Sequence, residues 1–318
     1  MTFMQEKHSN QQKSNSEGEI NLLELFRVLL HGKWIITFVI ALMSTIGVIY
    51  SLNLPNIYES KTLIVPSNPS TNIAGALRGY GGLAGLAGLS LPSQTDEGNA
   101  LKAIKKITSL SFFKNNVLIN IDLPDLMAVK SWDLKTNTLT FDENIYDMNS
   151  DTWIRDYSYS KLKIPSAQES FKVFVGEHLS LSQDEKTGFI TLSIKHQSPF
   201  IAKQWVELVV DEVNNFYRQK DKTASEKAVS YLNQQISATG LSEIKQVLAE
   251  LLQEETKKLT LIEANKYYVF DYIDPPVVME KKSEPNRSLI CIFSALLGGM
   301  LGILLVLLRY YIFSVKTS

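Results

Sequence analysis

Cysteine is almost absent from this chain of 318 residues. Cys291 is the only one, and it lies inside a long apolar stretch. A single cysteine excludes a disulfide framework and every CxxC metal or redox site. A folded domain in this chain must therefore be held together by packing and hydrogen bonds alone.

An excess of charge of one sign is also absent. The chain has 32 Lys and Arg residues against 33 Asp and Glu residues, a net charge of −1, and no run of five or more like charges. Proteins that bind nucleic acid usually carry a basic patch that neutralises phosphates. The composition therefore argues against nucleic acid as a partner.

Familiar catalytic and metal-binding patterns are missing as well. There is no HExxH motif, no GxSxG turn and no phosphate-binding GK[ST] loop. Adjacent acidic residues on predicted helices, such as Asp211 and Glu212, point about 100° apart and cannot form a catalytic carboxylate pair. The histidines do not lie at metal-ligand spacing; they are His8, His31, His178 and His196. We therefore expect no catalytic residue, no metal and no cofactor, and we predict that the chain is not an enzyme.

What the sequence does contain is a pair of uncharged apolar stretches, residues 34–54 and 288–308. Each is close to the roughly 20 residues that a helix needs to cross a bilayer about 30 Å thick. Two crossings put both chain ends on one side of the membrane and about 230 residues on the other. The first stretch is too long for the apolar part of a signal peptide and has no A-x-A pattern before Pro55, so we interpret it as an uncleaved anchor.

Basic residues near the first stretch favour a cytoplasmic amino terminus. Arg27 and Lys33 precede it, and the next basic residue is Lys61, which agrees with the positive-inside tendency. The second stretch is ambiguous because basic residues flank both of its ends: Lys281, Lys282 and Arg287 before it, Arg309 and Lys316 after it. Since the first span usually decides the orientation, we expect residues 1–33 and 309–318 to be cytoplasmic.

The amino-terminal tail has two predicted parts. Residues 1–18 are polar, and we expect them to be disordered. Residues 20–30 carry apolar side chains at helical spacing, namely Leu22, Leu23, Phe26, Leu29 and Leu30. This amphipathic helix either lies along the inner membrane surface or continues directly into the first span, and the sequence leaves both possibilities open.

Residues 55–198 are predicted to form the first part of a mixed α/β domain. β-branched and aromatic residues predict a strand at 57–65, and a helix at 166–177 precedes a hairpin of strands 178–181 and 188–195. Three aromatic residues are interpreted as packing residues rather than as ligand contacts: Trp132, Trp153 and Tyr157.

A glycine-rich tract follows the first predicted strand, with glycines at intervals of three: Gly79, Gly82, Gly85 and Gly88. The few repeats, which contain no proline, do not fit collagen, and no GK[ST] follows to make a phosphate loop. Glycine at this density favours a flexible loop over a stable helix. The leucines between the glycines lead us to expect burial against a neighbouring subunit or the membrane.

Residues 199–264 are predicted to form a long helical region with one interruption at Thr239 and Gly240. Ser198 before Pro199 is typical of a helix start. If nearly straight, this region would reach roughly 90–100 Å at 1.5 Å per residue. One domain of this size cannot bury such a helix, so we expect it to pack against other copies of the chain.

Residues 265–287 lead back to the membrane. Aromatic and β-branched residues at 267–278 predict a strand that pairs with the one at 57–65, because both adjoin the spans. Prolines mark the rest of this segment: Pro275, Pro276 and Pro285. The second span has a small residue at every fourth position, a face that allows close helix packing: Ser294, Gly298 and Gly302.

Three segments together resemble the chain-length determinant family, the Wzz-type polysaccharide co-polymerases of Gram-negative inner membranes. They are EINLLELFRVLLHGKW before the first span, YESKTLIVP with the later tract GGLAGLAGLSL, and FDYIDPPVVMEKKSEPNRSLI before the second span. The third is the most specific, because the family carries a proline-rich stretch there. Met279 and Glu280 stand about where another proline is common, so this motif is partial. In their order, the segments cover the whole chain.

The resemblance implies an α+β membrane protein in which two transmembrane helices flank a periplasmic α/β domain with a long extended helix. It also implies a homo-oligomer in the inner membrane that sets the modal length of O-antigen or a related glycan. Such a protein acts without catalysis, beside the membrane polymerase that joins lipid-linked repeats. Because the chain has no nucleotide-binding module, it resembles the kinase-free class of the family.

Other interpretations remain open. The chain is compatible with a subunit of a tyrosine-kinase-coupled capsule or exopolysaccharide export system, if the kinase is a separate chain. A two-span periplasmic sensor would need an inner signalling module, for which the short tails leave no room. The sequence does not reveal which glycan is involved, how many copies assemble or how length is measured; one hypothesis is that the helical tip near residues 230–260 holds the growing glycan.

Overall fold

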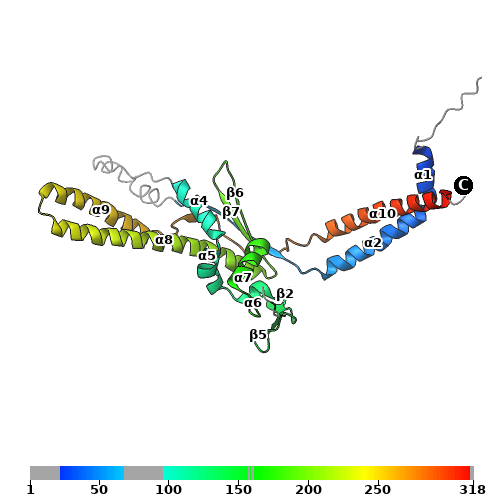
Figure 1. Ribbon diagram of the computed structural model, residues 1–318, viewed down its shortest axis with the longest axis horizontal. Coiled ribbons are helices and arrows are strands. Elements are labelled where there is room, and N and C mark those ends of the chain that lie inside the picture. The colour runs from blue at the N-terminus through cyan, green and yellow to red at the C-terminus, as the bar shows by residue number, and fades with distance from the viewer. Residues whose placement is uncertain (1–21, 68–95, 157, 159–160, 316–318) are drawn as a thin grey trace, which may run out of the picture. The chain divides into compact units, whose positions relative to one another are not determined.

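The computed structural model describes residues 22–67, 96–156, 158 and 161–315 (Figure 1). The predictions for residues 1–18, for the four glycines of the tract at 79–88 and for Tyr157 lie outside the described residues. The chain divides into two compact units. One consists of Met1–Leu54 with Asn286–Ser318, and the other is Pro55–Pro285.

The first unit consists of helices α1 (Leu22–His31), α2 (Lys33–Asn53) and α10 (Arg287–Val315). By length and composition, α2 and α10 are able to cross a membrane, with mean hydropathies of 2.2 and 2.6 in their most apolar windows. Helix α1 is a separate helix, because the helical run is interrupted at Gly32. The alternative of one continuous helix from residue 20 into the span is therefore wrong.

The second unit is built on a four-stranded antiparallel sheet with the strand order β6-β7-β1-β8. Its strands are β6 (Leu179–Gln183), β7 (Ile190–His196), β1 (Tyr58–Pro66) and β8 (Phe270–Asp274). The predicted hairpin is confirmed as β6 and β7, and the predicted pairing of the first and last strands is confirmed as β1 and β8. Distant parts of the sequence thus meet in the middle of this sheet.

One main core lies between this sheet and the helices. Helix α8 (Pro199–Ala238) packs on the sheet through buried valines such as Val206 and Val213, which meet the buried Ile194 and Leu192 of β7. The other side of the core is closed by apolar side chains of shorter helical segments, among them Phe112, Phe113 and Phe174. These segments are α4 (Asp96–Ile107), α5 (Leu110–Phe112), η1 (Phe113–Val117), η2 (Leu118–Asn120), α7 (Ala167–Val173) and η3 (Phe174–His178).

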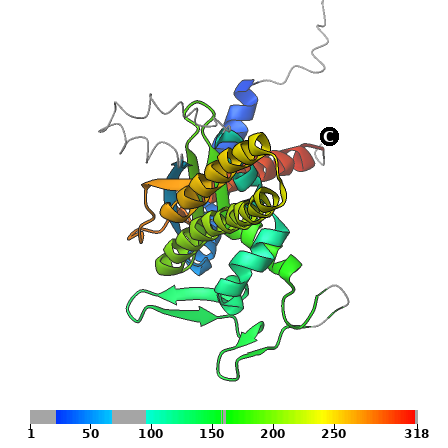
Figure 2. The same cartoon turned by 90° about the vertical axis from the view of Figure 1, so that its left-hand side faces the viewer.

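A second, smaller core holds two short hairpins that follow helix α6 (Leu123–Met127). The strands are β2 (Val129–Asp133), β3 (Thr138–Phe141), β4 (Tyr146–Asp147) and β5 (Thr152–Trp153), and Figure 2 shows both hairpins projecting away from helices α8 and α9. Trp153 packs on Tyr146 at a ring-centroid distance of 5.3 Å, so its prediction as a packing residue is confirmed. The sequence analysis did not predict these hairpins.

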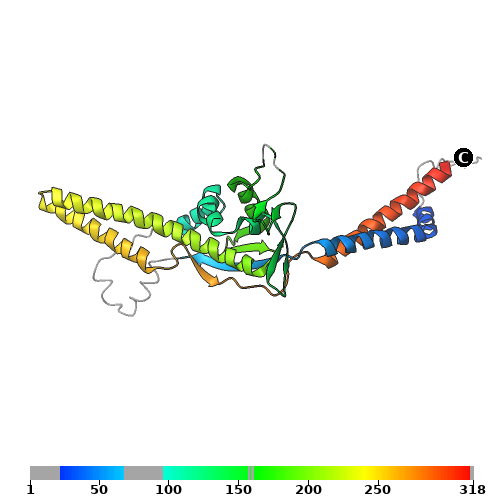
Figure 3. The same cartoon turned by 90° about the horizontal axis from the view of Figure 1, so that it is seen from below.

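The helical region at 199–264 is a hairpin of two helices, not a nearly straight rod. After α8 the chain is extended at Thr239 and Leu241, and α9 (Ser242–Ala264) then returns alongside α8 (Figure 3). An ion pair between Lys222 and Glu263 joins the two helices. The expected length of 90–100 Å is therefore wrong, because the 40 residues of α8 extend only about 60 Å.

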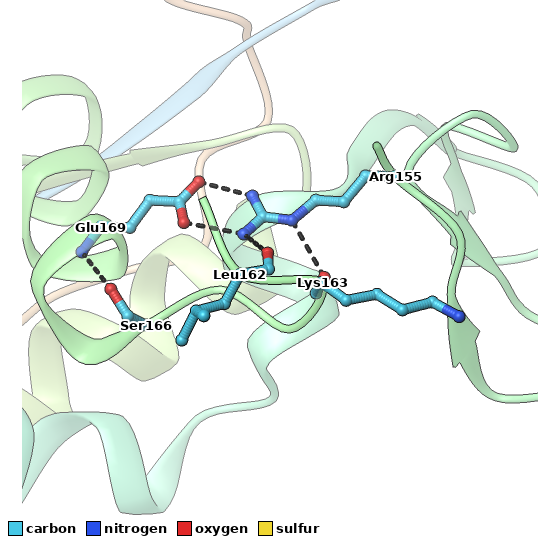
Figure 4. A network of polar contacts seen from close by, with 5 residues as sticks. All are labelled: Arg155, Leu162, Lys163, Ser166 and Glu169. Atoms are coloured by element: carbon cyan, nitrogen blue, oxygen red, sulfur yellow. Dashed lines mark hydrogen bonds and ion pairs between the residues drawn. The ribbon is translucent and has the colours of Figure 1, made fainter. Parts of the chain in front are cut away.

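Two polar networks hold the second unit together, one half-buried and one buried. The guanidinium of Arg155 donates to both carboxylate oxygens of Glu169 and to the carbonyl oxygens of Leu162 and Lys163 (Figure 4). The backbone N–H of Glu169 donates in turn to the hydroxyl of Ser166, which begins helix α7. Since the planar guanidinium of arginine fits a carboxylate with two parallel hydrogen bonds, this network fixes the loop before α7.

The other network surrounds Asn214, which is 3 % exposed in the middle of α8. Its Oδ1 accepts from the backbone N–H groups of Val269 at 2.7 Å and Phe270 at 2.9 Å, and its Nδ2 donates to the carbonyl of Phe270 at 3.0 Å. The side-chain amide of Asn214 therefore satisfies backbone groups at the start of β8, as a peptide group of a neighbouring strand would. Together, the two units form an α+β protein in which two membrane-capable helices flank an α/β domain with a long helix.

Candidate functional site

The small-residue face of α10 lies against α2. A Cβ atom built on Gly298 would lie 2.9 Å from the Cβ of Met43 and 3.0 Å from the Cα of Ile40, and one on Gly302 would lie 2.9 Å from the Cα of Ile36. Real Cβ atoms do not approach other atoms this closely, so glycine is needed at both positions. The backbones of the two helices meet as closely as in other small-xxx-small pairs.

The same contact continues toward both ends of the helix pair. Ser294, the third small residue of this face, lies against Gly47, where a Cβ would be only 2.5 Å from the Cβ of Ser294. At the other end, a Cβ on Gly32 would be 2.4 Å from a methyl carbon of Val306. The face formed by Ser294, Gly298 and Gly302 is thus covered by α2 of the same chain. A membrane partner must therefore contact other sides of the pair, where large side chains such as Trp34 and Met300 are exposed.

The proline segment runs as an extended strap beside β1. Hydroxyls of β1 hold it, since Thr62 donates to the carbonyl of Asp274 at 2.7 Å and Ser60 donates to that of Val277 at 2.9 Å. Ile57 and Glu284 then pair through their backbones at its far end. Within this strap Pro275 is exposed, Pro276 is buried and Pro285 is half-buried. The three prolines therefore do not form one surface.

A polar cleft lies beside the ends of β1 and β7 and was not predicted. It brings together His178 and His196, whose ring centroids are 5.7 Å apart against the indole of Trp205. Asp125, in the first turn of α6, lies beside them. A signal for this pairing was present in the sequence, because His178 begins the first strand of the predicted hairpin and His196 directly follows the second.

Backbone groups hold both histidines. The Nδ1 of His196 accepts from the N–H of Ser198 at 2.9 Å, and its Nε2 donates to the carbonyl of Asp125 at 3.0 Å. Because a backbone N–H can only donate, this ring is neutral, and burial lowers its pKa to about 4. Burial also lowers the pKa of His178, whose Nδ1 lies 2.7 Å from the carbonyl of Lys195.

Asp125 also lines the cleft, and its pKa is shifted in the opposite direction to those of the histidines. Burial raises its pKa to about 6, with a smaller contribution from the negative charge of Asp122. Across the described ranges, no three His, Cys, Asp or Glu side chains are grouped so as to hold a metal ion. The cleft thus offers hydrogen-bonding groups rather than a metal-binding cluster.

The helical hairpin carries a row of apolar side chains that nothing in the described chain covers. They lie on α9 and just before it, at helical spacing: Leu241, Ile244, Val247 and Leu251. Each is between 45 % and 60 % exposed. Leu248 and Leu252 of the same helix are more buried, so α9 has one apolar face toward α8 and a second toward solvent.

This chain is similar to one known protein family over part of its length and to solved structures over most of it. Residues 18–112 match the family model described as Wzz, chain length determinant protein. No curated protein matches the chain. Among solved structures, a full-length bacterial polysaccharide co-polymerase is 16 % identical, with a TM-score of 0.42 and coverage of 92 % of this chain and 99 % of that chain. A fragment of WzzB, a polysaccharide co-polymerase from Salmonella Typhimurium, is 13 % identical, with a TM-score of 0.32 and coverage of 72 % of this chain and 100 % of that chain.

The match to the family model begins before α1, includes α2 and β1 and ends at α5. It contains the first two of the three segments that carried the resemblance in the sequence. On this match over residues 18–112, the resemblance of the chain to the chain length determinant (Wzz) family is confirmed.

Proposed function

We propose that this chain regulates the modal length of a surface polysaccharide, the O-antigen of lipopolysaccharide or a related glycan. It acts as a non-enzymatic co-polymerase beside the membrane polymerase that extends lipid-linked repeats. The observation that carries the proposal is the family match over residues 18–112, in a chain whose two membrane-capable helices flank one folded unit.

In this proposal the protein is a two-span protein of the bacterial inner membrane. Residues 55–285 lie in the periplasm and both termini lie in the cytoplasm. Support comes from Arg27 and Lys33, the basic residues before α2, since such residues favour the cytoplasmic side. Alkaline phosphatase fused after Pro285 should be active and a fusion after Val315 inactive; the reverse pattern would contradict this orientation.

We further propose that the protein acts as a homo-oligomer. The exposed apolar row Leu241, Ile244, Val247 and Leu251 supports this part of the proposal, because a soluble surface does not usually leave a second apolar helix face uncovered. Two charged substitutions in this row, Val247→Glu and Leu251→Glu, should lower the assembly mass of the purified full chain. A mass equal to that of the unchanged protein would count against this interface.

The kinase-free assignment rests on the absence of a nucleotide-binding motif in the sequence. Neighbouring genes distinguish the two classes. An O-antigen polymerase and flippase beside this gene would support the proposal, whereas a tyrosine kinase and an outer-membrane export pore would favour the kinase-coupled export system.

Deletion of the gene tests the function itself. Surface polysaccharide from the deletion strain, separated on a gel, should lose its modal cluster of lengths and show a graded ladder instead. A complementing copy of the gene should restore the cluster. An unchanged length distribution in the deletion strain would overturn the proposed function.

A further inference from the structure

The polar cleft has the dimensions and the lining of a small ligand site. Its volume is about 250 Å³, below the roughly 300–1,000 Å³ of pockets that hold drug-sized ligands. One wall is apolar and includes Ile57 and Val129, while Asp125, Glu177 and Gln197 provide polar groups. An apolar wall with a few polar groups is typical of sites that bind a small organic molecule.

The polar groups of the cleft are mainly hydrogen-bond acceptors without partners. The Oε1 atom of Gln197 is buried and has no hydrogen-bond partner, which is uncommon for a buried amide oxygen. Glu177 is exposed at the rim, and no hydrogen bond contributes to the pKa of Asp125. These side chains therefore offer several acceptor oxygens to a ligand that has hydrogen-bond donors.

The charges around the cleft exclude an anionic ligand. Two acidic residues, Asp125 and Glu177, line the cleft, and the raised pKa of Asp125 is still only about 6, below neutral pH. The one cation of the lining, Lys195, forms an ion pair with Glu284 on the proline strap. His178 and His196 have lowered pKa values and donate to backbone carbonyls. A phosphate or a uronic acid would therefore be repelled at this position.

Three aromatic residues lie within three positions in sequence of residues that line the cleft. Tyr58 follows Ile57, Trp132 lies on the strand that begins at Val129, and Phe200 comes three residues after Gln197. The ring centroids of Trp132 lie 5.4 Å from Tyr58 and 6.1 Å from Phe200, and the side chain of Phe200 is 48 % exposed. Such rings offer flat apolar contact area beside polar groups.

We propose that this cleft binds a neutral sugar residue of the growing glycan. A neutral sugar has many hydroxyl donors for the acceptor oxygens of Asp125, Glu177 and Gln197. It also has apolar C–H faces for the wall that includes Ile57 and Val129. This inference rests on the proposed function, because that function brings a glycan to the periplasmic unit, and it gives the glycan a contact point away from the helical tip.

The test measures binding to the full-length chain in lipid nanodiscs by saturation-transfer difference NMR. The probe is a set of oligosaccharides released by mild acid from the polysaccharide of the producing strain. The unchanged protein should transfer saturation to the sugar ring protons. The double variant Asp125→Ala with Glu177→Ala should weaken binding at least tenfold, because both carboxylate acceptors are lost.

A matched control carries Glu185→Ala with Glu250→Ala, which changes the net charge equally at two exposed positions outside the cleft. It should bind like the unchanged protein. The single variant Glu177→Ala removes one exposed side chain and should keep the melting temperature of the unchanged protein. Weaker binding by this variant at an unchanged melting temperature therefore comes from loss of the carboxylate and not from unfolding.

Equal binding by the cleft variant and the control would overturn the inference. Absence of transfer from the unchanged protein would do the same, even if deletion of the gene still abolished the modal length, in which case the proposed function would stand. If deletion left the lengths unchanged while the cleft bound the sugars, the proposed function would fail and the binding site would remain.

Discussion

Replacing Asn214 by alanine is expected to destabilise the second unit, Pro55–Pro285, strongly. The amide of Asn214 accepts from two backbone N–H groups and donates to one backbone carbonyl at the start of β8, and it is 3 % exposed. Alanine leaves all three backbone groups without a partner in a site that water does not reach. The change also leaves a space where the amide was.

The expected cost follows from these three groups. A buried donor or acceptor left without a partner costs about 1–3 kcal/mol. Partial relaxation of β8 reduces the sum for three adjacent groups, so we expect a loss of about 3–5 kcal/mol in the free energy of unfolding. For a unit of this size, about 1 kcal/mol shifts the melting temperature by 2–4 °C, so the decrease should be roughly 10 °C.

Thermal unfolding of the full-length chain in detergent, followed by intrinsic fluorescence, measures this decrease. The matched control is Asn215→Ala at the next position of α8, where the side chain is exposed and accepts only from Arg218. The control should melt within about 2 °C of the unchanged protein. If the two variants melted at the same temperature, the role assigned to Asn214 would be wrong.

Three further substitutions test other parts of the structure. Gly302→Leu should disrupt the α2–α10 contact and alter the modal length without lowering the protein level. Gly299→Leu should leave the modal length unchanged, because a Cβ at Gly299 would lie 3.8 Å from its nearest atom. The same polysaccharide banding pattern for both variants would contradict this prediction. Arg155→Lys should lower the free energy of unfolding by about 1–3 kcal/mol, measured by urea denaturation, because lysine cannot make the paired hydrogen bonds; an unchanged urea midpoint would refute it. The lowered pKa of His196 makes folding weaker as pH falls from 6.5 to 4, and the raised pKa of Asp125 acts in the opposite direction below about pH 6. Asp125→Asn should therefore steepen the loss of stability between pH 6.5 and 4, and a urea midpoint with the same pH dependence as the unchanged protein would exclude this coupling.

The sheet could largely be predicted from the sequence. The strands at 57–65 and 267–278 have the β-branched and aromatic residues of buried strands, and both adjoin apolar spans that bring them together. The structure pairs them as β1 and β8, although β8 is shorter than predicted. Local composition and the constraint from the membrane were sufficient here.

The return of α9 along α8 could not be predicted in the same way. Thr239 and Gly240 mark an interruption, but an interruption alone does not specify the direction of the next helix. That direction depends on contacts between distant residues, such as the ion pair of Lys222 with Glu263 and the burial of Leu232 and Ile262. A pattern read along one helix does not contain such contacts.

The short hairpins β2–β3 and β4–β5 were missed for a different reason. Their strands have two to five residues, too few for an alternating pattern to be recognised. Their turns depend on Asn137 and Asp151, which adopt positive φ values of 53° and 50°. Asn and Asp tolerate this conformation, but many of these residues in the chain do not adopt it.

The cleft was also missed, although the predicted hairpin had His178 at the start of one strand and His196 directly after the other. The histidines were compared only for metal-ligand spacing along the sequence, which does not detect residues that meet across a hairpin. Asp125 reaches the cleft through α6, which docks on the sheet by the hydrogen bond from His196 to its carbonyl. That contact joins residues 71 positions apart and has no local signal.

Transfer to another strain tests whether this chain sets polysaccharide length together with a membrane polymerase. The gene is expressed in a strain that keeps its polymerase but lacks its own chain length determinant, and the surface polysaccharide is separated on a gel. We expect the graded ladder of the recipient strain to change to a modal cluster of lengths. A ladder that stays graded while the protein is present in the membrane would overturn the proposed function.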